Sequence, residues 1–214
     1  MGAIFLIRHG QASCGTANYD ELSSRGEEQA RHLGYAWEAA GWLPTTAASG
    51  SMKRHHQTAL NALAAAGQVE GYDVDHGWDE FDHEAVMKAQ TPGFQTKDPQ
   101  AFQDAFVRAT DRWVAGHADG DHESFADFSA RVLAAFDRLT LTAGRGETSV
   151  VFTSGGPIAI VAARLLKADA TLWSTLNSVM INTGVTKIVT GRSGRTLLSF
   201  NEHGHLPADQ VTYR

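Results

Sequence analysis

The chain has 214 residues, of which 43% are hydrophobic, with a formal net charge of −6 and a single cysteine, Cys14. This length suits one hydrophobic core, so we expect a single domain over residues 1–214. The acidic balance, without long runs of like charge, argues against nucleic acid or an anionic membrane as a partner. The first apolar stretch, residues 3–7, is too short for a membrane span, and one cysteine forms no internal disulfide, so we expect a cytoplasmic protein.

Strand-like and helix-like patterns then alternate along the chain, which predicts an α/β protein with a largely parallel sheet covered on both faces. Residues 3–8 read as a buried strand, and residues 24–40 as an amphipathic helix that stops at Gly41. The further predicted helices cover 52–66, 125–141 and 156–166, and the further strands 45–49, 149–153, 179–189 and 196–200.

Residues 72–120 break this alternation. Pro92, Gly93 and Pro99 interrupt the pattern before apolar residues at helical spacing from Phe102 to Trp113. We therefore expect a small inserted cap at about 81–120.

The strongest chemical signal is Arg8-His9-Gly10, where the first strand ends. Ligands of doubly wound sheets bind at the carboxyl ends of strands, so an imidazole there has access to substrate. His9 attacks phosphorus only as neutral imidazole, while Arg8 disfavours imidazolium and offers donors to phosphate oxygens. Gly10 lets the backbone approach an anion. A surface turn without a role is the alternative.

A second element, Ser49 through Ala59, joins the second strand to the next helix. Ser51 is expected to cap that helix, and Arg54 in its first turn faces the same sheet edge as His9. Two arginines would then hold one phosphate. Alone, Arg54 reads equally as a solvated charge on an exposed helix.

With these motifs and Leu22 through Ala30, the sequence resembles the histidine phosphatase superfamily, also called the phosphoglycerate mutase-like family. The resemblance implies a three-layer α/β/α sandwich with a mostly parallel central sheet. It also implies a phosphohistidine on His9, phosphate contacts from Arg8 and Arg54, and metal-independent chemistry without a cofactor.

Glu80 matches the family's acid after the second helix. The leaving alkoxide needs a proton and the attacking water then needs a base, and one carboxyl serves both in turn. A bound phosphate dianion and burial would raise the pKa of Glu80. A solvated acidic loop is the alternative.

The sequence departs from the family at Ser154, where a second histidine usually stands. The following Gly155 and the start of a helix still favour an anion, so we expect Ser154 and Gly155 to bind phosphate. His83 is the first candidate to compensate for the missing histidine, with His55 behind it. A surface or core histidine remains the alternative for either.

Gln11 and Ser13 follow the first motif and are further candidates for the pocket. No histidine pattern organises a metal site. The sequence therefore predicts a phosphatase acting on a small phosphomonoester. A phosphoglycerate-type mutase and a binding module without turnover are the alternatives, and a homodimer is left open.

Overall fold

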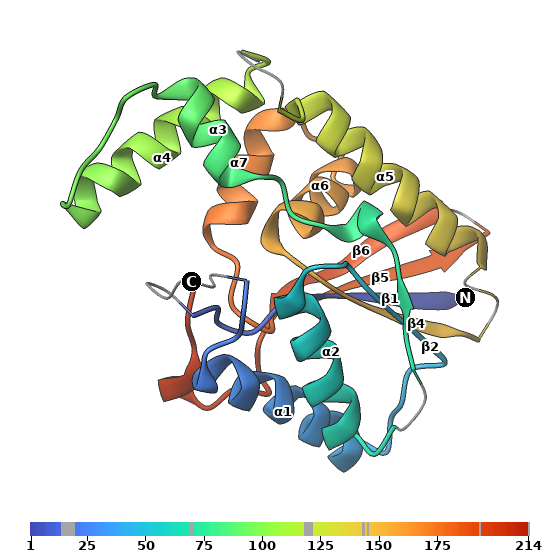
Figure 1. Ribbon diagram of the computed structural model, residues 1–214. Helices are drawn as coiled ribbons and strands as arrows, with labels where there is room; N and C mark the ends of the chain where they lie inside the picture. The colour runs from blue at the N-terminus through green and yellow to red at the C-terminus, as the bar shows by residue number, and fades with distance from the viewer. Residues whose placement is uncertain are drawn as a thin grey trace.

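The computed structural model describes residues 1–13, 20–68, 71–117, 122–142, 144, 146–192 and 194–213, so Cys14 lies outside the described residues. Its centre is a six-stranded sheet in the order β3-β2-β4-β1-β5-β6 (Figure 1). The strands are β1 Gly2–Arg8, β2 Thr46–Ser49, β3 Asp73–Val74, β4 Thr148–Thr153, β5 Val185–Gly191 and β6 Gly194–Glu202. Strands β1 to β4 run parallel, and β5 is antiparallel to both of its neighbours. The expected mostly parallel sheet is confirmed.

Helices cover both faces of this sheet, as expected for the three-layer sandwich (Figure 1). They are α1 Ser24–Ala39, α2 Lys53–Ala65, α3 His83–Gln90, α4 Pro99–Val114, α5 Phe125–Thr142, α6 Gly155–Leu165 and α7 Ala170–Ser178, with short 3₁₀ helices η1 His76–Trp78 and η2 Ala208–Gln210. Among the described residues no helix is both long and apolar enough to span a membrane.

The alternation of side chains along β1 divides the interior into two cores. Leu6 packs in the core that includes Val132 of α5, and its neighbour Ile7 packs in the core with Leu33 of α1 and Leu63 of α2. Successive residues of a strand point to opposite faces of its sheet, so an apolar run makes a strand that is buried on both sides.

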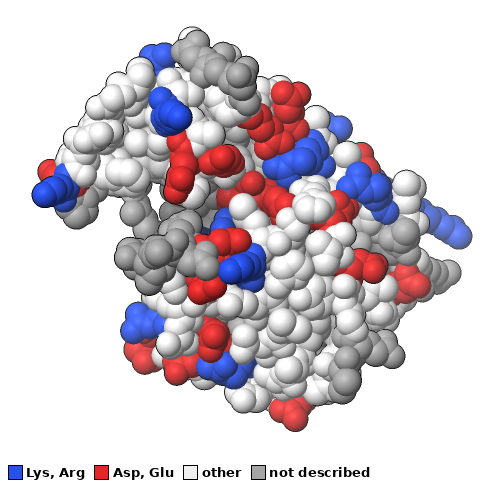
Figure 2. Space-filling model, in the orientation of Figure 1, with Lys and Arg blue, Asp and Glu red and all other residues white. Residues whose placement is uncertain are grey.

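The segment expected to be a cap contains two helices, α3, which the sequence did not signal, and α4, which includes the helical spacing from Phe102 to Trp113. They extend beyond the sheet as an arm (Figure 1), and the surface is hollowed beneath it (Figure 2). Trp113 anchors α4, because its ring stacks on Phe81 with centroids 4.7 Å apart and packs against Trp173 of α7. Such aromatic contacts stabilise beyond the area they bury.

Three sequence expectations need correction. Strand β5 begins at Val185 rather than at 179, because the preceding residues form a buried loop that bonds to the end of β1. Helix α7 was not expected at all. Ser51 does not cap α2: the N-cap is Met52, and the Ser51 hydroxyl donates to Asp79 instead.

Candidate active site

His9 lies directly after β1, held in place by its backbone. Its N–H donates to the carbonyl of Thr153 at the end of β4 at 2.8 Å, and its carbonyl accepts from the Thr183 N–H and from Asn182 Nδ2, each at 3.2 Å. The side chain is 8% exposed. The ends of two adjacent parallel strands therefore fix one nearly buried imidazole.

The tautomer of His9 follows from one contact. Nδ1 lies 2.6 Å from the carbonyl oxygen of Gly10, which only accepts, so Nδ1 carries the hydrogen and Nε2 keeps its lone pair. Burial, together with the Arg54 and Arg8 cations and the His55 ring, lowers the pKa of His9 well below its usual range. The geometry thus presents a neutral ring with a nucleophilic Nε2.

Gly10 packs closely against α1. A Cβ at Gly10 would lie 2.3 Å from the carbonyl oxygen of Gly26 in α1. Its N–H donates to Thr58 Oγ1 at 3.1 Å. Glycine at position 10 lets α1 and α2 close against the turn that carries His9.

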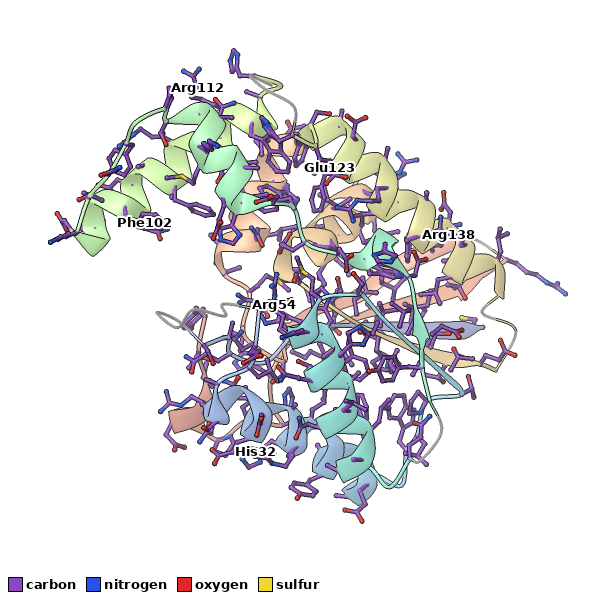
Figure 3. All side chains as sticks on the ribbon, in the orientation of Figure 1. His32, Arg54, Phe102, Arg112, Glu123 and Arg138 are labelled. Atoms are coloured by element: carbon purple, nitrogen blue, oxygen red, sulfur yellow. The ribbon has the colours of Figure 1, made fainter. Side chains whose placement is uncertain are left out.

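The two arginines come from different elements: Arg8 is the last residue of β1, and Arg54 lies in the first turn of α2. Arg8 Nη1 donates to the carbonyl oxygens of Met180 and Tyr213, the latter at 2.9 Å, so the late part of the chain holds this guanidinium. Arg54, at the start of α2, is 4% exposed (Figure 3). Its Nη1 donates to Asp20 Oδ1 at 2.7 Å, and among the described residues no hydrogen-bond partner reaches its buried Nε. A buried, incompletely bonded guanidinium is suited to an oxyanion.

The side chain of Glu80, a residue between η1 and α3, contacts the start of α6. Its Oε2 accepts from the Gly156 N–H at 3.0 Å, and its Oε1 accepts from the Phe81 N–H at 3.2 Å. Burial raises the pKa of Glu80, while the Gly156 N–H and the Arg54 cation oppose the rise. A carboxyl whose pKa is raised by burial is suited to protonate a leaving alkoxide.

Ser154 is fully buried at the end of β4, next to the residue that bonds to His9. Its hydroxyl does not cap α6 but shares a 2.7 Å hydrogen bond with His55 Nε2. Gly155 packs on α7, since a Cβ there would lie 2.5 Å from Asn177 Oδ1. The N–H of the next residue, Gly156, is bonded to Glu80.

The histidine that the structure brings against His9 is His55, with ring centroids 5.9 Å apart. His83, the first candidate from sequence, is the first residue of α3, and its ring lies 6.4 Å from that of Phe106. Burial lowers the pKa of His83. His83 therefore stands at the beginning of the arm, where the Arg54 cation also lowers its pKa.

Gln11 and Ser13, the other candidates for the pocket, hold the loop that follows His9. Gln11 Oε1 accepts from the Ser23 hydroxyl at 3.1 Å, and the Ser13 hydroxyl donates to the Leu22 carbonyl at 3.0 Å. Both side chains are bonded to the chain around the start of α1.

Sequence reasoning missed two residues that fix the site, Asp20 and Asn182. Asp20 lies two residues before the motif that begins at Leu22, and nothing in that sequence position indicates that its carboxylate pairs with Arg54 or bonds to the start of α2. Asn182 fell inside a predicted strand. Among the described residues no group of three or more His, Cys, Asp or Glu side chains is placed to hold a metal ion.

Residues 4–203 match the profile of the histidine phosphatase superfamily (branch 1). The chain belongs to this superfamily. The resemblance read from the three motifs is confirmed. No curated protein matches the chain.

Solved structures with the same fold span nearly the whole chain. They include a phosphoserine phosphatase from Entamoeba histolytica, 19% identical with TM-score 0.70, covering 97% of this chain and 100% of that one. A mycobacterial glucosyl-3-phosphoglycerate phosphatase is 22% identical with TM-score 0.69, covering 94% and 98%. A putative alpha-ribazole-5′-P phosphatase from Escherichia coli is 20% identical with TM-score 0.69, covering 97% and 100%. At these identities the likeness establishes the fold.

Proposed function

We propose that this histidine phosphatase superfamily member hydrolyses a small phosphomonoester through a phosphohistidine on His9. The observation that carries the proposal is the hydrogen bond from His9 Nδ1 to the Gly10 carbonyl, 2.6 Å long, which leaves the Nε2 lone pair available. The lowered pKa of His9 supports it, because a neutral imidazole needs no prior deprotonation at neutral pH.

In the first step Nε2 forms a bond to phosphorus while the bond from phosphorus to the ester oxygen breaks. Glu80 gives its proton to the departing alkoxide. In the second step water attacks phosphorus, Glu80 takes a proton from that water, and the bond to Nε2 breaks. Arg8, Arg54, Ser154 and Gly155 are proposed to contact the phosphoryl oxygens, whose charge the guanidiniums offset throughout.

Two alternatives remain as outcomes of the test. A mutase would return the phosphoryl group to a bound sugar acid, and a binding module would hold a phosphorylated ligand without turnover. The lowered pKa of His9 and the raised pKa of Glu80, each set mainly by burial and each influenced by the Arg54 and Arg8 cations, favour turnover. The three relatives named above carry different phosphorylated substrates in their names, so they do not select one for this chain.

The domain organisation, cellular location and partners are also part of the proposal. We infer one domain over residues 1–214 with the arm at about 81–120 as its cap. We also infer a cytoplasmic location, no nucleic acid partner, and a monomer or homodimer. The net charge of −6 supports the exclusion of nucleic acid.

The test is a rapid acid quench of the wild-type protein with phosphomonoesters, in EDTA. We expect turnover to survive chelation, vanadate to inhibit it, and His9 to carry an acid-labile, base-stable phosphate. His9→Ala should abolish both turnover and labelling. Activity that vanishes in EDTA and returns with a divalent metal would refute the mechanism, and full activity in His9→Ala would refute the nucleophile. Labelling that passes to an acceptor alcohol rather than to water would indicate the mutase.

A further inference from the structure

A second hydrogen-bonded pair lies beside the proposed nucleophile. Ser154 follows Thr153, whose carbonyl accepts the His9 N–H, and the Ser154 hydroxyl lies 2.7 Å from His55 Nε2. Both side chains are 0% exposed. The His55 ring is also 5.9 Å from the His9 ring, so the pair adjoins the reacting centre.

The surroundings of His55 fit this ring closely. Its Nδ1 lies 3.8 Å from Asp79 Oδ1, and the Asp79 carboxylate accepts from the N–H and the hydroxyl of Ser51, each at 2.6 Å. A Cβ at Gly50 would lie 2.3 Å from Nδ1. Only glycine at position 50 leaves room for the imidazole, so its position is fixed on both sides.

The hydrogens of this pair have two arrangements. Burial and the Arg54 cation lower the pKa of His55 well below its usual range, so the ring is neutral and carries one hydrogen. Either the serine donates to Nε2, or Nε2 donates to the serine oxygen and the hydroxyl hydrogen turns elsewhere. In the described part of the chain Nδ1 has no hydrogen-bond partner, since Asp79 Oδ1 at 3.8 Å is beyond hydrogen-bond reach, so no bond holds the hydrogen on Nδ1 and both arrangements are open.

We propose that His55 donates through Nε2 to Ser154 Oγ and so turns the Ser154 hydroxyl toward the phosphoryl group at His9. A bound phosphoryl group selects this arrangement, because its oxygens attract a hydroxyl hydrogen and repel a lone pair. His55 is then a positioning residue that acts through Ser154. Consecutive hydrogen bonds polarise one another, so the donor behind Ser154 strengthens its bond to the anion.

This inference rests on the proposed function and gives it a further component. At the end of β4 the Gly156 N–H is bonded to Glu80 and the Thr153 hydroxyl donates to the Trp78 carbonyl, so the Ser154 hydroxyl is the group there that is left for a phosphoryl contact. If His55 Nε2 carries no hydrogen, the Ser154 hydroxyl donates to Nε2 instead, and an oxygen lone pair then faces the phosphoryl group.

The experiment is a double-mutant cycle with a matched pair of variants at position 55. His55→Gln carries an amide N–H near the place of Nε2, whereas the shorter His55→Asn keeps a polar group only on the Asp79 side. We expect His55→Asn and Ser154→Ala each to lower kcat for a phosphomonoester about tenfold with a smaller change in KM. His55→Gln should retain most of the rate, and H55N/S154A should be no slower than Ser154→Ala alone. His56→Gln, at the neighbouring position, should match the wild type.

Vanadate affinity, measured on the same proteins, needs no turnover. If the wild type neither turns over nor labels His9, the proposed function fails, and the vanadate cycle still decides whether His55 acts through Ser154. Additive losses, or equal losses in His55→Gln and His55→Asn, would overturn the inference. Thermal melts establish folding of each variant. If His55→Asn does not fold, Gly50→Ala displaces the ring from outside, and a wild-type rate in that folded variant would overturn the inference as well.

Discussion

Arg54 and Asp20 form an ion pair, with Nη1 2.7 Å from Oδ1, in which the arginine side chain is 5% exposed and the aspartate side chain 38%. The other carboxylate oxygen accepts the Lys53 N–H at 2.9 Å, in the first turn of α2. Helix N-termini favour negative charge, so Asp20 is held by both the helix and the arginine. It also offsets part of the charge that Arg54 presents to a phosphate.

We therefore expect Asp20→Asn to tighten the binding of vanadate and of inorganic phosphate several-fold at low ionic strength. Asparagine keeps an acceptor for Arg54 and removes the competing charge. The gain should shrink as salt is added, because the carboxylate is partly exposed and its field is screened. Inhibition constants over a range of salt concentrations measure it.

Glu21→Gln is the matched control for Asp20→Asn. Glu21 lies next in the chain and pairs with Lys53 Nζ at 3.2 Å, so this substitution makes the same change in net charge away from Arg54. Equal gains in both variants would assign the effect to net charge alone. Weaker binding in Asp20→Asn would show that the carboxylate is needed to hold Arg54 in place.

Gly10→Ala is predicted to destabilise the protein by several degrees in Tm and to lower activity. The added Cβ would meet the Gly26 carbonyl oxygen at 2.3 Å, so the turn carrying His9 or the start of α1 must move. Gly71→Ala is the control, since nothing lies within 4 Å of a Cβ there. An unchanged Tm in Gly10→Ala would contradict the packing role.

The sequence was sufficient for elements whose pattern is local. Helix α1 was expected over 24–40 and runs Ser24–Ala39. Helix α2 was expected over 52–66 and runs Lys53–Ala65. Helical spacing of apolar residues predicts each helix, and a following glycine marks its C-terminal end. Helix α7 has nine residues with one buried side chain, Trp173, too little for a periodic signal.

The residues of the site also divide into those with a local sequence signal and those without one. Arg8, His9 and Arg54 follow from motifs at the ends of strands. The carbonyl of Met180 and the side chain of Asn182 reach that site from 172 and 173 residues away in the chain. The apolar run from Val179 to Ile181 favours a strand locally, and only these long-range bonds make it a loop. His55 was placed second to His83, because neither a helix position nor spacing shows that His55 points at Ser154.

Stability should fall as the pH drops below the ordinary histidine value of 6.5. The folded-state pKa values of His9 and His55 are lowered, so the unfolded chain takes up protons there while the folded chain does not. The stability is therefore complete above the unfolded value and is lost as the pH falls toward the folded values. Each group contributes up to about 1.4 kcal/mol per pH unit in that window.

Urea denaturation between pH 7.5 and 5.5 measures this dependence. His9→Gln and His55→Gln should each reduce the slope of unfolding free energy against pH, whatever they do to its absolute value. His76→Gln, at a side chain 82% exposed, is the control. Unchanged slopes in the first two variants would mean that these rings are protonated in the folded protein.

Glu80→Gln separates leaving-group protonation from phosphoryl binding. A glutamine keeps the size of the side chain and an acceptor for the Gly156 N–H but has no proton to give. We expect about a hundredfold loss of kcat/KM for an alkyl phosphate, within the range for general acid catalysis. The loss should be much smaller for p-nitrophenyl phosphate, because p-nitrophenolate departs without a proton.

Since burial raises the pKa of Glu80, the alkyl phosphate activity of the wild type is present below that pKa and falls as the pH rises through it. That descending limb should be absent for Glu80→Gln and present for Glu84→Gln, a variant at an exposed position of α3. Equal losses on both substrates would remove Glu80 from the role of acid and leave it as a residue that positions the start of α6.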